Sequence, residues 1–154
     1  MKRNDDHGWV VDASVMLKWS LRDAVEDFLE QADALYEAYL ARRIDIIAPC
    51  YARYEVAAGL EVARLQRRID LEGAQARLRW FLRTSVSDEE DDDSLLIAAI
   101  AVAERHSIAL YDAIYVALSE RLGYSFVTAD RRLHRSIAPQ LDFVRWIGDV
   151  SEIP

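Results

Sequence analysis

Cysteine is almost absent from this sequence of 154 residues, in which Cys50 is the only one. A single thiol cannot form an internal disulfide, and it leaves too few ligands for a structural zinc site built on cysteine. The class of small disulfide-stabilised secreted domains is therefore excluded, and we expect a protein of the reducing cytoplasm.

Long apolar runs are also missing. The longest, from Leu95 to Ala103, has nine residues, about half of the roughly 20 that a membrane-spanning helix needs. The basic residues at the N-terminus are followed by acids rather than by the apolar segment of a signal peptide. We therefore expect no membrane segment and no secretion signal, and we interpret the apolar run as a buried helix.

Positive charge is scarce as well. The chain has 19 Lys+Arg against 27 Asp+Glu, a formal net charge of −8. Domains that hold nucleic acid by bulk electrostatics usually carry the opposite sign, so tight non-specific binding is not expected. The five glycines and three prolines are scattered. Length and composition favour a single domain over residues 9–154, after a polar extension at residues 1–8.

Apolar periodicity predicts an alternation of strands and helices. Trp9 to Val11 is a short β-favouring run, and apolar residues spaced by three and four from Leu21 to Arg43 are typical of an amphipathic helix. Pro49 suits the first turn of a helix. The expected strands cover residues 9–11, 44–48, 84–87, 124–128 and 143–146, and the expected helices cover 21–43, 49–68, 71–83, 94–106, 112–121 and 130–137. This order predicts an α/β fold with a parallel sheet, in which ligands bind at the carboxyl ends of the strands.

Two acids stand where expected strands end. Asp12 directly follows the strand from Trp9 to Val11, and Asp130 follows the strand that ends at Thr128. Helix N-capping, a role that Asp fills well, is the alternative to a functional role for each of them.

Glu55 interrupts the apolar pattern of an expected helix. It shares a helix face with four apolar residues, Tyr51, Ala58, Val62 and Leu65. An ionised carboxylate on such a face is costly unless it is paired or hydrogen-bonded. A partner such as Arg53, or a face that is only partly buried, is the alternative to a functional role.

Asp112 is the most conspicuous acid in the chain. It is the only acid from Ile108 to Leu118, where the other ten residues are apolar. No basic residue lies in that run, so a counter-charge would have to come from elsewhere in the fold. Because Asp112 also opens an expected helix, N-capping is again the alternative.

The four acids Asp12, Glu55, Asp112 and Asp130 would meet at one edge of a parallel sheet. Crowded carboxylates repel one another, and cations between them relieve the repulsion. Hard oxygen ligands without a cysteine or histidine cluster favour Mg²⁺ or Mn²⁺. One or two such ions can activate water and stabilise the leaving oxygen in phosphodiester cleavage, so a metal-dependent nuclease is our hypothesis.

The acidic run from Asp88 to Asp93 is a different case. Six adjacent acids cannot converge on one ion. We expect a solvated loop that leads into a helix N-terminus, where negative charge is favourable.

Four motifs resemble those of PIN-domain nucleases, and most of all the VapC-type toxin ribonucleases of toxin–antitoxin pairs. They are V-V-D-A-S-V at residues 10–15, Y-E-V at 54–56, Y-D-A-I-Y-V-A-L at 111–118 and V-T-A-D-R-R-L at 127–133. Each motif is short, but together they follow the order of the family and span nearly the whole chain.

This resemblance implies a PIN-like three-layer α/β/α sandwich around a short parallel sheet. It implies that Asp12, Glu55, Asp112 and Asp130 are the catalytic residues and bind Mg²⁺ or Mn²⁺, with Thr128 as an auxiliary hydroxyl. The implied activity is that of an endoribonuclease, in which metal-activated water attacks an RNA phosphodiester and leaves a 5′-phosphate and a 3′-hydroxyl. It further implies a homodimer that a small cognate antitoxin silences.

Arg131 and Arg132 directly follow Asp130. Beside the expected site they are candidates for bidentate binding of substrate phosphates. Pairing with acids along the helix is the alternative.

Three other functions stay open. A PIN-domain nuclease of RNA processing or quality control would carry the same residues. A non-catalytic partner-binding module would leave Asp112 without a reason. A phospho-acceptor signalling domain would need a lysine at a late strand tip, whereas the only lysines are Lys2 and Lys18.

Overall fold

The computed structural model describes residues 8–22, 26–84, 86–89, 92–150 and 153. Its elements in chain order are β1 (Gly8–Val11), α1 (Ala13–Ser20), α2 (Leu29–Leu40), β2 (Asp45–Pro49), α3 (Ala52–Leu65), α4 (Leu71–Phe81), β3 (Ser87–Glu89), α5 (Asp93–His106), α6 (Leu110–Leu122), β4 (Ser125–Thr128), α7 (Arg131–Ile137), β5 (Val144–Trp146) and the 3₁₀ turn η1 (Ile147–Asp149). Gly8, which we expected in the N-terminal extension, is the first residue of β1. The rest of that expected extension lies outside the described residues.

The strands form one parallel sheet in the order β3-β2-β1-β4-β5. The chain steps outward from β1 to β3, returns to β4 beside β1, and steps outward again to β5. The direction of winding therefore reverses between β1 and β4, where Val11 pairs with Val127. In open parallel sheets, ligands bind outside the carboxyl ends of the strands at such a reversal. Asp12 and Asp130 follow these two strands.

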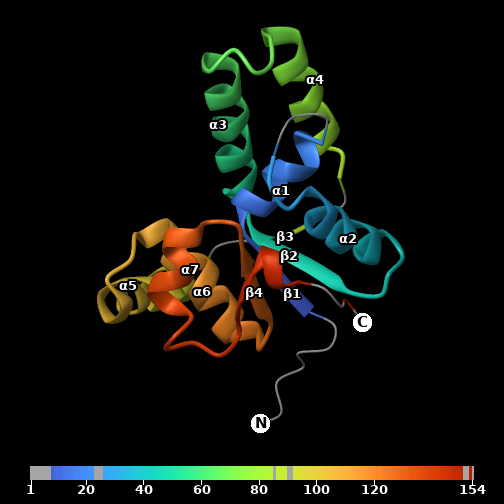
Figure 1. Ribbon diagram of the computed structural model, residues 1–154. Coiled ribbons are helices and arrows are strands. Elements are labelled where there is room, and N and C mark those ends of the chain that lie inside the picture. Colours follow the sequence, from blue (N-terminus) through green and yellow to red (C-terminus); the bar gives the residue numbers. More distant parts are fainter. Residues whose placement is uncertain (1–7, 23–25, 85, 90–91, 151–152, 154) are drawn as a thin grey trace.

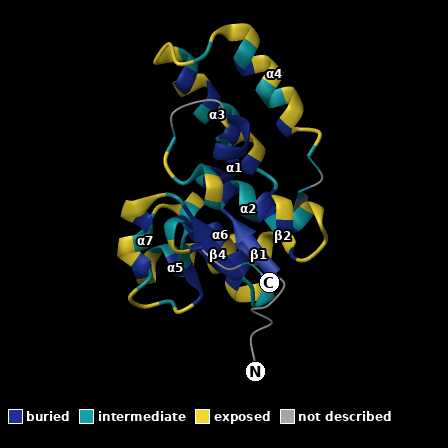
Figure 2. Cartoon of the chain, turned by 45° about the vertical axis from the view of Figure 1, so that its right-hand side comes forward, coloured by how far each residue is buried: buried dark blue, intermediate teal, exposed yellow. Residues whose placement is uncertain are grey.

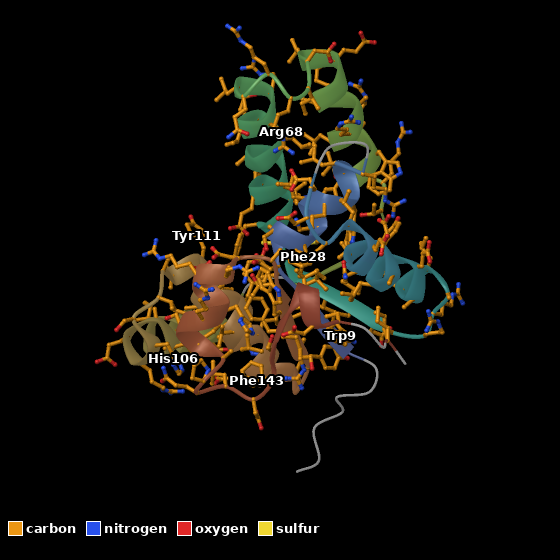
Figure 3. The ribbon with its side chains drawn as sticks, viewed as in Figure 1. Trp9, Phe28, Arg68, His106, Tyr111 and Phe143 are labelled. Atoms are coloured by element: carbon orange, nitrogen blue, oxygen red, sulfur yellow. The ribbon has the colours of Figure 1, made fainter. Side chains whose placement is uncertain are left out.

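The sheet is covered on both faces, as the prediction of an α/β/α sandwich requires. Figure 1 shows α1 to α4 on one side of the sheet and α5, α6 and α7 on the other, and α6 contacts β1, β2 and β4. Arg68 beyond α3 and His106 at the end of α5 lie on these opposite sides (Figure 3). The strands β1 and β4 are fully buried between the layers (Figure 2). The predicted fold class is therefore confirmed.

The first expected helix has different bounds in the structure. We predicted one helix from Leu21 to Arg43. In the structure Leu21 is the C-cap of α1, and the next helix, α2, begins only at Leu29. Six of the eight residues of α1 are buried, including Lys18 and Trp19. Helix α1 has only eight residues, which is too short a stretch to establish a helical period from the sequence.

Two further boundaries were predicted wrongly. Pro49 is the last residue of β2, where it pairs with Glu89, and not the first turn of a helix. The strand expected over residues 84–87 begins only at Ser87. The hydroxyl of Thr84 instead donates to the carbonyl of Phe81 and closes the end of α4.

Helix α5 is buried on one face only, contrary to our interpretation of its apolar run as a buried helix. Its inner face holds Leu95, Ala99 and Val102, whereas Ile97 and Ile100 are 70% and 63% exposed. Among the described residues, no single helix is long and apolar enough to cross a membrane, and α5 reaches that length only together with α6, at a bend of 110°.

A pair of substitutions tests this division of α5. Leu95→Ala is expected to lower the free energy of unfolding by about 2–5 kcal/mol, because it opens a cavity in the core. Ile97→Ala removes a side chain that is exposed in the single chain, and at protein concentrations where the chain is monomeric it is expected to change the free energy of unfolding by less than about 0.5 kcal/mol. Urea denaturation of both variants measures the difference. Equal losses would mean that the outer face of α5 is also buried in solution.

The acidic run was expected to form a loop, but its first two residues, Asp88 and Glu89, belong to β3 and pair with β2, so that part of the prediction was wrong. The end of the run behaves as expected. Asp92 caps α5 by accepting the N–H of Leu95 at 2.7 Å, and it forms a bidentate ion pair with Arg121 at the end of α6. The hydrogen bonds from Arg121, then Ser94 and Leu95, lower the pKa of Asp92. Residues 90 and 91 of the run lie outside the described residues. Asp92 thus ties two helices together.

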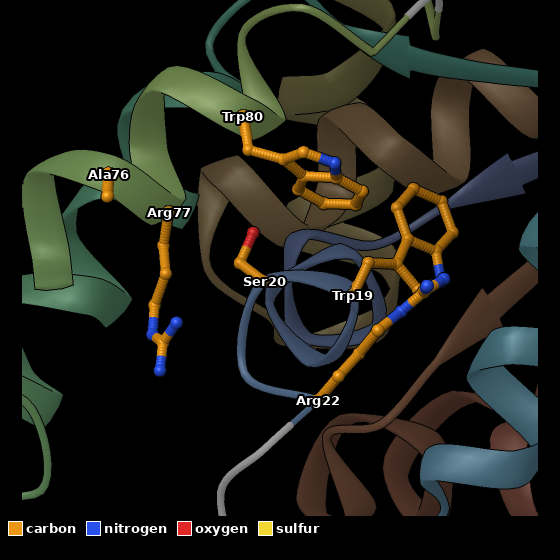
Figure 4. A pocket seen from close by; sticks show the side chains of 6 residues that line it. All are labelled: Trp19, Ser20, Arg22, Ala76, Arg77 and Trp80. Carbon is orange, nitrogen blue, oxygen red and sulfur yellow. The ribbon is translucent and has the colours of Figure 1, made fainter.

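A hollow of about 400 Å³ lies between α1 and α4 (Figure 4). Arg22 pairs with Asp33 at 2.8 Å, and its guanidinium lies 5.7 Å from the centre of the Trp80 ring. The residues that line the hollow are Trp19, Ser20, Arg22, Ala76, Arg77 and Trp80, and the four predicted site acids are not among them.

Candidate metal centre

Asp12 occupies the N-cap position of α1, but its side chain makes no capping hydrogen bond. Its Oδ2 instead accepts the hydroxyl of Thr128 at 2.5 Å and that of Ser14 at 2.7 Å. Burial raises the pKa of Asp12, and the negative charge of Asp130 adds to this rise, whereas the two hydroxyls and the backbone N–H of Ser14 oppose it. N-capping therefore does not account for this buried carboxylate.

Hydrogen bonds of two hydroxyl groups connect the ends of β1 and β4. Besides donating to Asp12, Thr128 accepts the N–H of Asp130 at 2.9 Å, and Ser14 accepts the N–H of Ala129 at 2.9 Å. The backbone N–H of Asp12 donates to the carbonyl of Val127 at 3.0 Å. Asp12 is therefore held in one orientation between β1 and β4, where the winding of the chain through the sheet reverses.

Asp130 does cap a helix. Its Oδ1 accepts the N–H groups of Arg132 and Leu133 at 2.8 and 3.0 Å, at the start of α7. The alternative that we gave for this residue thus holds, and both capping bonds end on the same carboxylate oxygen. The charge of the exposed carboxylate still raises the pKa of Asp12 and of Asp112.

Asp112 is not an N-cap. That position of α6 belongs to Ala109, and Asp112 lies within the first turn. Burial, followed by the charges of Asp12 and Asp130, raises its pKa to about 6, while the charge of Arg132 acts in the opposite direction. The half-buried carboxylate therefore faces two other acids.

Glu55 lies in the first turn of α3, on a face that is only partly buried. The residues expected around it are mostly exposed, with Val62 and Leu65 at 50% and 65%. Its partner is not Arg53, whose guanidinium lies 5.4 Å from the centre of the Tyr54 ring. It is Tyr115 of α6, whose hydroxyl donates to Glu55 Oε2 at 2.7 Å.

The pKa of Glu55 is raised to about 7. Burial is the main cause, and the charges of Asp12 and Asp112 add to it, whereas the hydrogen bond from Tyr115 lowers it. Burial and the nearby acids also raise the pKa of Tyr115 well above its ordinary value, so the phenol stays a donor. Glu55 is thus the fourth member of one group of interacting carboxylates.

The donor chemistry of this group fits a hard divalent cation. Burial and the charges of neighbouring acids raise the pKa of Asp12, Glu55 and Asp112, and a cation among these carboxylates would relieve the repulsion. Among the described residues, no three acidic, histidine or cysteine side chains already converge as a ligand set. Glu55 and Asp112 are only half-buried, so another rotamer is open to each at a small cost.

Two supporting residues were not singled out from the sequence. Ser14 and Tyr115 orient Asp12 and Glu55. Ser14 stands two residues after Asp12, but nothing in that spacing reveals its bond to Ala129. A tyrosine inside the apolar run of α6 was a usable signal, because a buried phenol needs a hydrogen-bond partner.

Comparisons with known proteins agree with this architecture. A family model described as the PIN domain matches residues 9–137. None of the curated proteins compared with the sequence matches it. PAE2754 from Pyrobaculum aerophilum is 22% identical over 88% of each chain, with a TM-score of 0.61. VapC20 from Mycobacterium tuberculosis, described as a sarcin–ricin loop cleaving toxin, is 16% identical over 84% of this chain and 95% of its own, with a TM-score of 0.59.

The similarity to the two solved structures concerns the fold. The family match spans most of the chain and includes the positions of all four acids. Together with the sheet order and the motifs, it shows that this protein belongs to the PIN domain family.

Proposed function

We propose that this protein is a divalent-metal-dependent endoribonuclease that acts as the toxin of a toxin–antitoxin pair. PIN domains are generally metal-dependent nucleases. The observation that carries the proposal is the group of four acids at the reversal between β1 and β4, in which burial and neighbouring charges raise the pKa of Asp12, Glu55 and Asp112. The fold similarity to VapC20 supports the role of a toxin.

In this proposal Asp12, Glu55, Asp112 and Asp130 hold Mg²⁺ or Mn²⁺. The ion, when bound, would activate water against an RNA phosphodiester and stabilise the leaving oxygen. Asp12 is the fixed member, because two hydroxyls orient it. The pKa of Glu55, about 7 without metal, means that its carboxylate has to release a proton before it binds the ion at neutral pH. Thr128 is the auxiliary hydroxyl that links Asp12 to the backbone of Asp130.

The direct test is incubation of the purified protein with single-stranded and structured RNA. Cleavage is expected with Mg²⁺ or Mn²⁺ and not with EDTA, and the products should carry 5′-phosphates. Cleavage that persists in EDTA would refute the metal mechanism. Absence of cleavage with every divalent ion tried would favour the non-catalytic partner-binding module.

A nuclease of RNA processing or quality control is the second candidate, because it would use the same four acids. The genomic neighbourhood and the effect on growth separate the two. A small antitoxin-like reading frame immediately upstream, and growth arrest that its co-expression relieves, are expected for a toxin. Expression without any effect on growth would favour RNA processing.

We also propose that the protein forms a homodimer in the cytoplasm, where its RNA substrate and antitoxin would be found. The exposed apolar side chains of α5, among them Ile97 and Ile100, support self-association. Sedimentation of the purified protein tests this, and a monomer at high concentration would contradict it.

Tyr115→Phe tests how Glu55 is positioned. Without the phenol, the pKa of Glu55 should rise further, since this hydrogen bond lowers it. Loss of a residue that orients a metal ligand typically weakens metal binding by about 10–100-fold. Titration with Mn²⁺ at pH 7 measures the change in metal affinity. Tyr111→Phe is the control, because it removes the hydroxyl group of a tyrosine that is 61% exposed. Equal affinities of the two variants would exclude the positioning role.

A further inference from the structure

A small pocket opens beside the group of acids, between the α5–α6 connection and α7. Its volume is about 170 Å³, and Asp112, Asp130 and Arg132 line one part of it. Ile108, Ala109 and Leu133 supply apolar residues to the lining, which Ser107 and Ser136 complete. A water molecule takes up about 30 Å³ of liquid, so the pocket has room for several atoms of a ligand and not only for one water molecule.

Arg132 offsets part of the negative charge around Asp112, but no direct bond holds its guanidinium among the described side chains. Its guanidinium makes no hydrogen bond or ion pair with the side chains that the structure describes, although Asp112 and Asp130 line the same pocket. It is also the second residue of α7, and a cation in the first turn opposes the helix dipole. Arginine is well suited to bidentate contacts with phosphate oxygens.

Arg131 differs from its neighbour in this respect. Its guanidinium lies 4.7 Å from the centre of the Trp146 ring, so packing on β5 accounts for it. The sequence suggested both arginines as phosphate ligands. In the structure Arg131 packs against an aromatic ring, whereas Arg132 lines the pocket.

We propose that this pocket binds the nucleotide next to the phosphodiester that is cleaved, with the Arg132 guanidinium on a backbone phosphate of single-stranded RNA. The apolar wall takes the ribose or base of that nucleotide, while the phosphate lies beside the acids. The inference rests on the proposed ribonuclease function and adds the residue that positions the strand. It also explains how a chain of net charge −8 could hold RNA at one place only.

Three matched variants test the proposal. Arg131→Ala, Arg132→Ala and Arg135→Ala each remove one positive charge from the same helix. Binding of a labelled single-stranded RNA is measured in the Asp12→Asn background, so that cleavage does not interfere. We expect Arg132→Ala to weaken binding by about tenfold or more, and each of the other two by less than about threefold. Its plot of log affinity against log salt should lose a slope of about 0.7, the value of one single-strand phosphate contact.

Two further variants address the pocket itself. Ser136→Phe fills it from an exposed position and keeps Arg132, so it should also weaken RNA binding. Arg132→Lys should restore the salt slope but only part of the affinity, because a lysine cannot form the bidentate contact. Melting temperatures of all variants establish that they are folded.

The outcomes separate this inference from the proposed function. Equal losses in the three alanine variants, or RNA binding by Ser136→Phe that matches the parent, would overturn the pocket even if the wild-type protein cleaves RNA. A wild-type protein that cleaves no RNA with any divalent ion would instead refute the ribonuclease, whatever Arg132 contributes to binding.

Discussion

Asp112→Asn is expected to reduce metal-dependent RNA cleavage by more than about 100-fold, which exceeds the usual cost of disturbing a residue outside the ligand set. Asp112 lies among carboxylates that raise its pKa to about 6, and it makes no capping bond that the substitution would break. The variant should therefore fold while it loses one ligand. Gel analysis of RNA products at saturating Mg²⁺ or Mn²⁺ measures the loss.

Glu104→Gln is the matched control for this experiment. Glu104 is an exposed acid of α5, a helix that holds none of the four acids. The Glu104→Gln substitution removes one negative charge, as Asp112→Asn does, and should leave cleavage within about twofold of the wild type. Asp12→Asn should be as damaging as Asp112→Asn, because the two carboxylates act on the same ion in our proposal. Undiminished cleavage by either Asn variant would refute the assigned metal centre.

Without metal, the protein is expected to be more stable at pH 5 than at pH 8. The folded pKa of Glu55 is about 7 and that of Asp112 about 6, above their ordinary values of 4.5 and 3.8. The folded state therefore holds more protons than the unfolded state, and stability is lost as the pH rises through the folded values. Because solvent reaches both half-buried groups, the discounted effect is about 1 kcal/mol each, or about 4–8 °C in Tm together.

Thermal unfolding in EDTA, with and without Mg²⁺ or Mn²⁺, measures this effect. Asp112→Asn should flatten the dependence on pH and melt above the wild type at pH 8 in EDTA, since one repelling charge is gone. A divalent ion at 100 times its Kd should restore about 2.7 kcal/mol to the wild type and much less to the variant. An Asn variant that melts below the wild type without metal would contradict the crowding of these acids.

The fold class and the four acids could be predicted because each rests on a local pattern. The alternation of strands and helices predicts a parallel sheet. Asp12 and Asp130 follow strands that short apolar, β-favouring runs identify in the sequence. Errors arose where the pattern was incomplete. Helix α1 has only eight residues, too few to establish a helical period, and Pro49 is compatible with a strand end as well as with a helix start.

The sequence by itself determined that this chain is an α/β protein of the PIN domain family, with the four acids for which we propose a divalent-cation site. Only the tertiary structure decided what each acid does there. Asp130 caps a helix and Asp12 does not, Glu55 is held by Tyr115 and not by Arg53, and Arg132 lines a pocket while Arg131 packs on Trp146. The physical reason is that these partners come from different elements, as with Thr128 and Asp12, which are 116 residues apart. Their contacts depend on how the layers pack, and local sequence does not record that.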